Sequence, residues 1–244
     1  MKIGIAILNW NGLNLLKSHL KGVVSKSNNS CVYIIDNNSS DGSVKFVRDN
    51  FPEVKIISLD KNYGFAGGYN KGLKAITEDL ICIMNNDIEV TSNWLDPIRE
   101  IFSEKPNSIV QPTIMDLNNR QYFEYAGASG GFIDKYGYPF CRGRIFKTLE
   151  KNNGQYLDSK IFWASGACMF LPKKQFFELG GFDESFFAHM EEIDLCWRLY
   201  AMGFEVWVEP DSVVYHKNAL TLPMYSHKKY YLNHRNSLLM LLGN

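Results

Sequence analysis

The run Leu80-Ile81-Cys82-Ile83-Met84 is continuously apolar and leads directly into Asn85-Asn86-Asp87. An uninterrupted apolar run of this length is typical of a strand buried on both faces of a parallel sheet. In open α/β sheets, ligands bind beyond the carboxyl ends of the strands. A carboxylate at such an end can hold a divalent cation, and capping of the next helix by Asp87 is the simpler alternative.

Three earlier segments repeat this pattern of an apolar run followed by polar residues. Strands are predicted at residues 3–8, 32–35 and 54–59, with helices at 15–24, 43–50 and 72–76. Polar clusters follow the strands at 9–11, 36–38 and 62–64. This alternation predicts a parallel sheet covered by helices on both faces, with the polar clusters gathered along one edge.

Composition narrows the class of protein. The 244 residues carry equal numbers of acidic and basic side chains, so a general nucleic-acid binder, which normally has a positive excess, is disfavoured. The five cysteines form no CxxC pair and are predicted to be free thiols in a reducing compartment. The sequence shows no signal peptide and no run of about 20 apolar residues. A cytoplasmic protein is therefore expected.

The residue composition and the pattern of predicted strands change after residue 114. We expect one domain with a nucleotide-binding half at 1–114 and an acceptor-binding half at 115–244. The glycine-rich stretch 130–154 is predicted to be a mobile loop, and helices are predicted at 173–179 and 191–202.

Candidate chemistry in the second half lies at an acidic helix start. Glu191, Glu192 and Asp194 open the last of these helices, where the helix dipole favours an ionised carboxylate suited to act as a general base. The alternative is an ordinary acidic first turn with Asp194 paired to Arg198. His216 ends another strand and is either a metal ligand or a structural histidine.

Two features of the first half suit a nucleotide. Asp36 ends a strand, where it can accept hydrogen bonds from a base or a ribose, or simply form an Asx turn. The glycine-rich stretch 61–70 precedes a helix and suits a diphosphate, or else allows close helix packing. It lacks the GxGxxG fingerprint, so a nicotinamide dehydrogenase is disfavoured.

Together these segments resemble the inverting family 2 glycosyltransferases of the GT-A fold, and more narrowly the bacterial rhamnosyltransferase-like branch that builds cell-surface polysaccharides. The matching stretches are 6–11, 35–43, 62–70, 84–90, 165–168, 180–184, 191–199 and 230–239. The resemblance implies an α/β fold: a GT-A type single domain, whose Rossmann-like, mostly parallel central sheet is flanked by helices and joined by a smaller mixed acceptor-side sheet.

The resemblance also implies roles for individual residues. The donor-binding residues would be Asn9, Asn11, Asp36, Asn62, Gly67, Asn70, Asn86 and Arg235. Asp87 and His216 would hold a divalent metal, Mn²⁺ or Mg²⁺, although Asn85 stands where the family's DxD motif has its first Asp. The acceptor side would be lined by Ser165, Gly166 and Ala167. Glu192 takes the place of the family's catalytic Asp, with Glu191 as the second candidate for the base.

The implied partners are a nucleoside-diphosphate sugar donor and a glycan or lipid-linked acceptor, with no nucleic acid. The basic and aromatic segment 227–236 either contacts the inner face of the plasma membrane or forms a surface helix packed on the core. Two other functions stay open. A catalytically silent homologue would explain Asn85 and Glu192, whereas a sugar nucleotidyltransferase would require an early phosphate loop with arginine, which residues 9–14 lack.

Overall fold

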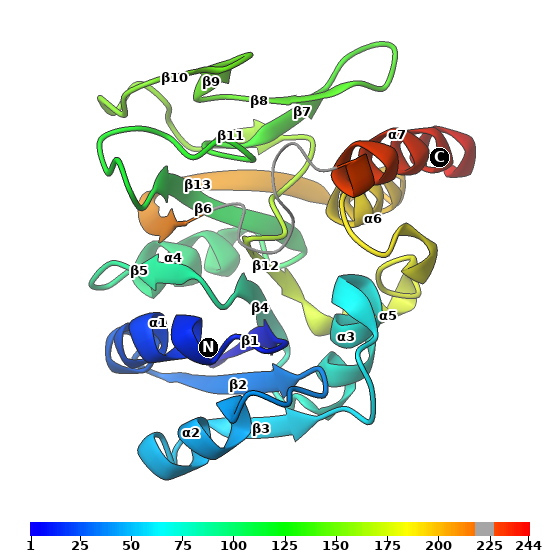
Figure 1. Ribbon diagram of the computed structural model, residues 1–244. Helices are drawn as coiled ribbons and strands as arrows, with labels where there is room; N and C mark the ends of the chain where they lie inside the picture. Colours follow the sequence, from blue (N-terminus) through cyan, green and yellow to red (C-terminus); the bar gives the residue numbers. More distant parts are fainter. Residues whose placement is uncertain (218–226) are drawn as a thin grey trace.

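The structure is a computed structural model and describes residues 1–217 and 227–244. The strands of the main sheet are β1 Ile3–Asn9, β2 Ser30–Asp36, β3 Lys55–Ser58, β4 Leu80–Asn85, β5 Ile88–Val90, β6 Ser108–Asp116, β11 Ser159–Ile161, β12 Cys168–Pro172 and β13 Glu205–His216. Within the described residues these nine strands run in the order β11-β13-β6-β12-β4-β1-β2-β3, with β5 paired to β13 (Figure 1).

Helices cover both faces of this sheet. Their bounds are α1 Leu13–Lys26, α2 Ser43–Asn50, α3 Gly64–Gly72, α4 Leu95–Glu104, α5 Lys173–Glu178, α6 Glu191–Ala201 and α7 His227–Gly243, with 3₁₀ turns η1 Leu73–Ala75 and η2 Glu184–Phe186. One core packs α1, α2 and α4 against the side chains of Ile3, Ile5 and Ile7. The other packs α3, α5, α6 and α7 against the opposite face, which includes Ala6 and Tyr33. Alternation along each strand thus builds two separate cores.

The predicted parallel half is confirmed. β1 lies between β2 and β4 and is parallel to both, and β2 is parallel to β3. All five cysteines are free thiols, and only Cys31 is not fully buried. In the part of the chain that the structure describes, every helix falls short of the length or the apolarity needed to span a membrane.

The second half differs from expectation in two ways. Its strands pair in mixed directions, as expected, but they extend the central sheet instead of forming a separate one, because β12 pairs with both β4 and β6. Residues 130–154 were expected to be a mobile loop and instead form two hairpins, β7 Gly131–Ile133 with β8 Pro139–Cys141 and β9 Arg144–Ile145 with β10 Thr148–Leu149. The proposed boundary at residue 114 falls inside β6.

Helix α3 begins earlier than the predicted helix at 72–76. Its glycines hide it from sequence patterns, because glycine is a poor helix former. They serve close packing: a Cβ on Gly68 would lie 2.7 Å from a Leu8 side-chain carbon, and one on Gly72 would lie 2.5 Å from Ile35. The packing interpretation of the stretch 61–70 therefore holds for Gly68.

Candidate active site

The carboxyl ends of β2, β1 and β4 bring three predicted polar clusters to one edge. Asn9 lies beside Asp36 in the β1–β2 register, and Leu8 lies beside Asn85 in the β1–β4 register. The side chain of Asn86 donates a hydrogen bond to Asn9 Oδ1 at 2.9 Å. This edge is where an open α/β sheet binds its ligands.

Asp36 forms the turn that was one of its two sequence interpretations and keeps one carboxylate oxygen without a partner. Its Oδ2 accepts a hydrogen bond from the backbone N–H of Ser39 at 3.1 Å, which is the Asx-type turn. Its Oδ1 is buried and has no hydrogen-bond partner in the described residues. Because a buried acceptor without a partner costs free energy, this oxygen is suited to receive an N–H or O–H group from a ligand. Asn11 is engaged nearby, where its Oδ1 accepts from Ser40 N at 2.8 Å.

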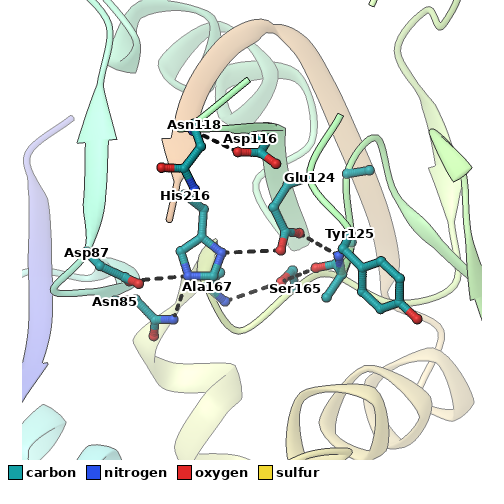
Figure 2. Close-up of polar contacts among 12 residues, drawn as sticks. Asn85, Asp87, Asp116, Asn118, Glu124, Tyr125, Ser165, Ala167 and His216 are labelled. Carbon is teal, nitrogen blue, oxygen red and sulfur yellow. Dashed lines mark hydrogen bonds and ion pairs between the residues drawn. The ribbon is translucent and has the colours of Figure 1, made fainter. Parts of the chain in front are cut away.

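Asp87 and His216, the predicted metal pair, lie side by side between β4 and the end of β13 (Figure 2). Asp87 Oδ1 is 3.2 Å from His216 Nε2, and both residues are buried. On the other side of the ring, Glu124 Oε1 is 3.5 Å from His216 Nδ1. At that distance the contact is an ion pair rather than a well-formed hydrogen bond.

The neighbouring carboxylates determine the protonation state of His216. Burial alone would lower the pKa of His216, but the contacts with Asp87 and Glu124 and the charges of these carboxylates outweigh it and raise the pKa to about 10. Burial alone would raise the pKa of Asp87, yet hydrogen bonding and charge from His216 outweigh this and lower it. The protonated ring of His216 therefore lies between Asp87 and Glu124.

Asp87 and His216 could supply two of the ligands of a divalent cation. A carboxylate and an imidazole whose ligating atoms are 3.2 Å apart suit Mn²⁺, which accepts oxygen and nitrogen ligands. No group of three or more His, Cys, Asp or Glu side chains placed to hold a metal occurs among residues 1–217 and 227–244. The remaining ligands would then come from diphosphate and water, as is usual for cations bound with substrate phosphates.

Glu124 is a site residue that sequence patterns missed. It is fully buried, and its Oε2 accepts a hydrogen bond from Ala126 N at 2.6 Å. The nearby Ser165 hydroxyl donates to Ala126 O at 3.1 Å, and Ala167 O accepts from Asn85 N at 2.9 Å (Figure 2). The predicted acceptor segment, residues 165–167, is thus hydrogen-bonded both to the loop that follows Glu124 and to the end of β4.

The acidic start of α6 lies beside the same segment. A Cβ on Gly166 would be 3.6 Å from the Cβ of Glu192. Glu191 is buried and Glu192 is partly exposed, and each has an Oε2 atom without a hydrogen-bond partner among the described residues. The third acid, Asp194, forms an ion pair with Arg198 at 2.7 Å, so the alternative interpretation holds for this residue.

The two glutamates titrate as a pair. Burial, and next the charge of Glu192, raise the pKa of Glu191 well above its usual value. Burial also raises the pKa of Glu192, although backbone N–H groups, including that of Gly166, oppose the shift. The ionised form of one such acid disfavours ionisation of the other, and the more exposed residue, Glu192, is better placed to exchange a proton with a ligand.

Other predicted donor residues have protein partners. Asn62 Oδ1 accepts from Asn37 at 2.9 Å and shapes the turn before α3. Asn70 hydrogen bonds both the N–H and the carbonyl of Phe182. A Cβ on Gly67 would lie 3.3 Å from the Glu184 carboxyl group. Arg235, expected at the diphosphate, donates to the carbonyls of Ser185 and Phe186 instead.

Two cavities lie elsewhere, along β6 and β13. One, of about 400 Å³, is lined by Met115, Arg120, Gln121, Lys151, Asn152, Asn153, Val213 and Tyr215. The other, of about 320 Å³, includes Thr113, Phe123 and Glu209 in its lining. Neither lining contains Asp36, Asp87 or Glu192.

Comparisons with known proteins agree with this geometry. The chain is 24% identical over 203 residues to N-acetylglucosaminyl-diphospho-decaprenol L-rhamnosyltransferase of Mycobacterium tuberculosis, covering 76% of this chain and 66% of the relative. It is 23% identical over 201 residues to the low-salt glycan biosynthesis hexosyltransferase Agl10 of Haloferax volcanii, covering 80% of this chain and 61% of the relative. The chain thus spans about two thirds or less of the length of these curated relatives.

Solved structures show the same fold. The crystal structure of GalNAc-T7 with UDP, GalNAc and Mn²⁺ superposes with a TM-score of 0.76 at 17% identity, covering 99% of this chain and 47% of that one. The expected GT-A type fold is therefore confirmed. The family model described as Glycosyl transferase family 2 matches residues 5–177. This chain accordingly belongs to glycosyl transferase family 2.

Proposed function

We propose that this chain is a metal-dependent, inverting glycosyltransferase domain. It would move a sugar, with rhamnose as the first to test, from a nucleoside-diphosphate donor to a glycan or lipid-linked acceptor in cell-surface polysaccharide synthesis. The observation that carries the proposal is the place of Asn85, whose side chain lies 3.3 Å from His216 Nε2 and whose backbone N–H donates to Ala167 O. Gly166, the residue before Ala167, lies beside Glu192, so the acceptor-side segment lies between the metal-type pair and the candidate base.

The donor would lie along the carboxyl edge of the sheet. The unpartnered Oδ1 of Asp36 is suited to accept from the ring N–H of a pyrimidine base. The diphosphate would approach Asp87 and His216, which are the residues that would hold Mn²⁺ or Mg²⁺. When bound there, the cation would offset negative charge on the departing diphosphate.

Glu192 would act as the general base. Its carboxylate removes the proton from an acceptor hydroxyl, and the oxygen forms a bond to the anomeric carbon of the donor sugar. The bond from that carbon to the diphosphate oxygen breaks on the opposite face, and the electron pair leaves with the nucleoside diphosphate. One displacement inverts the anomeric centre, so no covalent enzyme intermediate is needed.

A donor screen tests the proposal. Thermal unfolding of the chain would be followed with UDP- and dTDP-sugars, each with and without Mn²⁺, because a ligand that binds the native state raises the apparent stability. Released nucleoside diphosphate in the presence of an acceptor supports a transferase. Released pyrophosphate would indicate a nucleotidyltransferase instead. Donor binding without turnover would indicate the silent homologue.

Trp10 gives a separate prediction for donor binding. Its side chain is 54% exposed in the turn after β1, and the neighbouring Asn11 contacts the segment that follows Asp36. An exposed indole at a nucleotide edge is suited to stack on the base, which is worth about 1–3 kcal/mol. Trp10→Ala should therefore weaken UDP or dTDP binding by about 5- to 150-fold in a calorimetric titration. Phe146→Ala, at an 86% exposed aromatic elsewhere, is the control and should leave the Kd unchanged.

A further inference from the structure

The loop that leads into α6 has an unusual backbone. Phe187, His189 and Met190 have φ angles of 64°, 71° and 75°, in the left-handed region that favours glycine. Each non-glycine residue held there costs about 1–3 kcal/mol, so the surroundings must stabilise the loop. The loop ends directly before Glu191 and Glu192, the two carboxylates at the start of α6.

Helix α7 supplies that stabilisation through one buried amide. Asn236 has no exposed surface, and its Nδ2 lies 2.9 Å from Phe186 O, 2.9 Å from Ala188 O and 2.7 Å from His189 O. A side-chain amide has two N–H donors, which are shared here among three carbonyl oxygens. Leu232, Asn236 and Met240, spaced four residues apart, form the buried face of the helix. Figure 1 shows α7 beside α6.

Arg235 fixes the orientation of this amide. Its Nε donates to Asn236 Oδ1 at 2.9 Å, and its Nη2 donates to Ser185 O at 2.7 Å and to Phe186 O at 3.0 Å. A flipped Asn236 amide would place its oxygen against three carbonyl oxygens and lose the bond from Arg235. Both side chains therefore act on the same loop, residues 185–190.

The loop in turn sets where α6 begins. Met190 O accepts the first-turn hydrogen bond from Asp194 N at 2.9 Å, so the position of Met190 determines the first turn that carries Glu191 and Glu192. A second contact with α6 comes from Asn244, the residue after α7, whose Nδ2 donates a hydrogen bond to Asp194 Oδ1 at 2.8 Å. Both helices lie outside residues 5–177, the part matched by the family model.

We propose that Asn236, oriented by Arg235, is a positioning residue that holds the loop 185–190 in its left-handed conformation and so aims Glu192 at the acceptor hydroxyl. The second half of this statement rests on the proposed transferase function. The first half concerns the loop alone and can be tested without turnover. Misplacement of a catalytic group by about 1 Å costs on the order of 100-fold in rate.

Asn236→Asp is the informative variant, because it keeps the size of the side chain but places an acceptor oxygen against the three carbonyls. Asn233→Asp makes the same chemical change one turn earlier on α7, where the residue is only partly buried, and serves as the matched control. With the donor and acceptor found active for the wild type, kcat of Asn236→Asp should fall about 100-fold while the Kd for UDP stays within about twofold. Asn233→Asp should retain the wild-type kcat.

Hydrogen exchange provides the second measurement. In Asn236→Asp the backbone amides of residues 187–194 should exchange at least about tenfold faster, whereas those of β1 and β4 should not change. Unchanged exchange at 187–194, or faster exchange throughout the chain, would overturn the assignment. Local loosening with an undiminished kcat would also overturn it, because the loop would then not position the base.

Arg235→Gln is the milder second variant in case Asn236→Asp does not fold. It removes the guanidinium donors from Ser185 O and Phe186 O and should give a smaller effect of the same kind in both measurements. If the wild type turns over no donor, the transferase proposal fails. The exchange measurement then still decides whether the two α7 residues hold the loop.

Discussion

Replacing Glu192 with glutamine is expected to lower kcat about 1,000-fold, within the range that a general base contributes, while the Kd for the nucleotide donor changes by less than about threefold. The amide keeps the shape of the side chain but cannot take the proton of the acceptor hydroxyl. Glu192 is partly exposed and lies beside Gly166 of the predicted acceptor segment, and its Oε2 has no hydrogen-bond partner among the described residues. Single-turnover kinetics together with a donor titration would separate chemistry from binding.

Glu191→Gln is the matched control. Burial and the charge of Glu192 raise the pKa of Glu191 well above its usual value, so Glu191 is the carboxyl group that ionises less readily. Glu191→Gln should leave kcat within about tenfold of the wild type, since the proposed base is Glu192. A large loss in Glu191→Gln with little loss in Glu192→Gln would move the base to Glu191.

The pair also sets a pH dependence whose sign can be worked out. A carboxyl group whose pKa is raised in the folded state stabilises that state below the unfolded pKa, and the stabilisation is lost as pH rises through the folded value. Glu191→Gln should therefore raise Tm relative to the wild type at pH 8 and give no gain at pH 4.

The kcat/KM of the wild type should rise with pH through an apparent pKa above the usual glutamate value, since burial raises the pKa of Glu192.

The sheet edge was predictable from the chain because its cause is local. Each early apolar run ends in polar residues, and parallel strands place their carboxyl ends on the same side of the sheet. Asn9, Asp36 and Asn86 lie together there for that reason, as the strand registers and the Asn86–Asn9 hydrogen bond show. His216 reaches Asp87 through the pairing of β13 with β5 and β6, which the strand pattern did not predict. The resemblance implied only that His216 assists the metal.

The roles of Glu124 and Arg235 depend on contacts between distant parts of the chain, which hydrophobic periodicity does not reveal. Glu124 is a buried carboxylate in a loop between short strands, and nothing about its neighbours in the sequence marks it as a partner of His216. Arg235 offered a positive charge, and charge alone favoured a diphosphate as its partner. Its partners are backbone carbonyls of residues about fifty positions earlier, which only the fold brings within reach.

The sequence pattern also did not specify which residues of α7 are buried by the core and which are exposed. Its packed-helix interpretation is correct for Leu232 and Met240, which are buried, but Leu238 and Leu242 are 63% and 85% exposed. Contact of this segment with an anionic membrane therefore stays a prediction. A sequence run of leucines indicates apolarity but does not specify which side of a helix the core will cover.

The Asp87–His216 pair gives the second large effect. Asp87→Asn should weaken donor binding in the presence of Mn²⁺ by about 100-fold or more and change it little without the cation, because loss of even an outer-shell partner costs 10- to 100-fold in metal affinity. The amide keeps the volume of a buried side chain and its reach to His216 Nε2, now 3.2 Å from Asp87 Oδ1, so the fold should tolerate the change. Titrations of UDP with and without Mn²⁺ measure the difference directly.

The control for this variant is Glu89→Gln, which removes a carboxylate two residues later whose partner is Arg120 at 2.7 Å. It should leave the Mn²⁺ dependence of donor binding intact, since Glu89 does not contact His216 among the described ion pairs. Equal losses of donor affinity with and without Mn²⁺ in Asp87→Asn would contradict a metal role and assign Asp87 to the donor itself. A loss confined to the Mn²⁺ titration would make Asp87 the single carboxylate that compensates for Asn85 at the start of the motif.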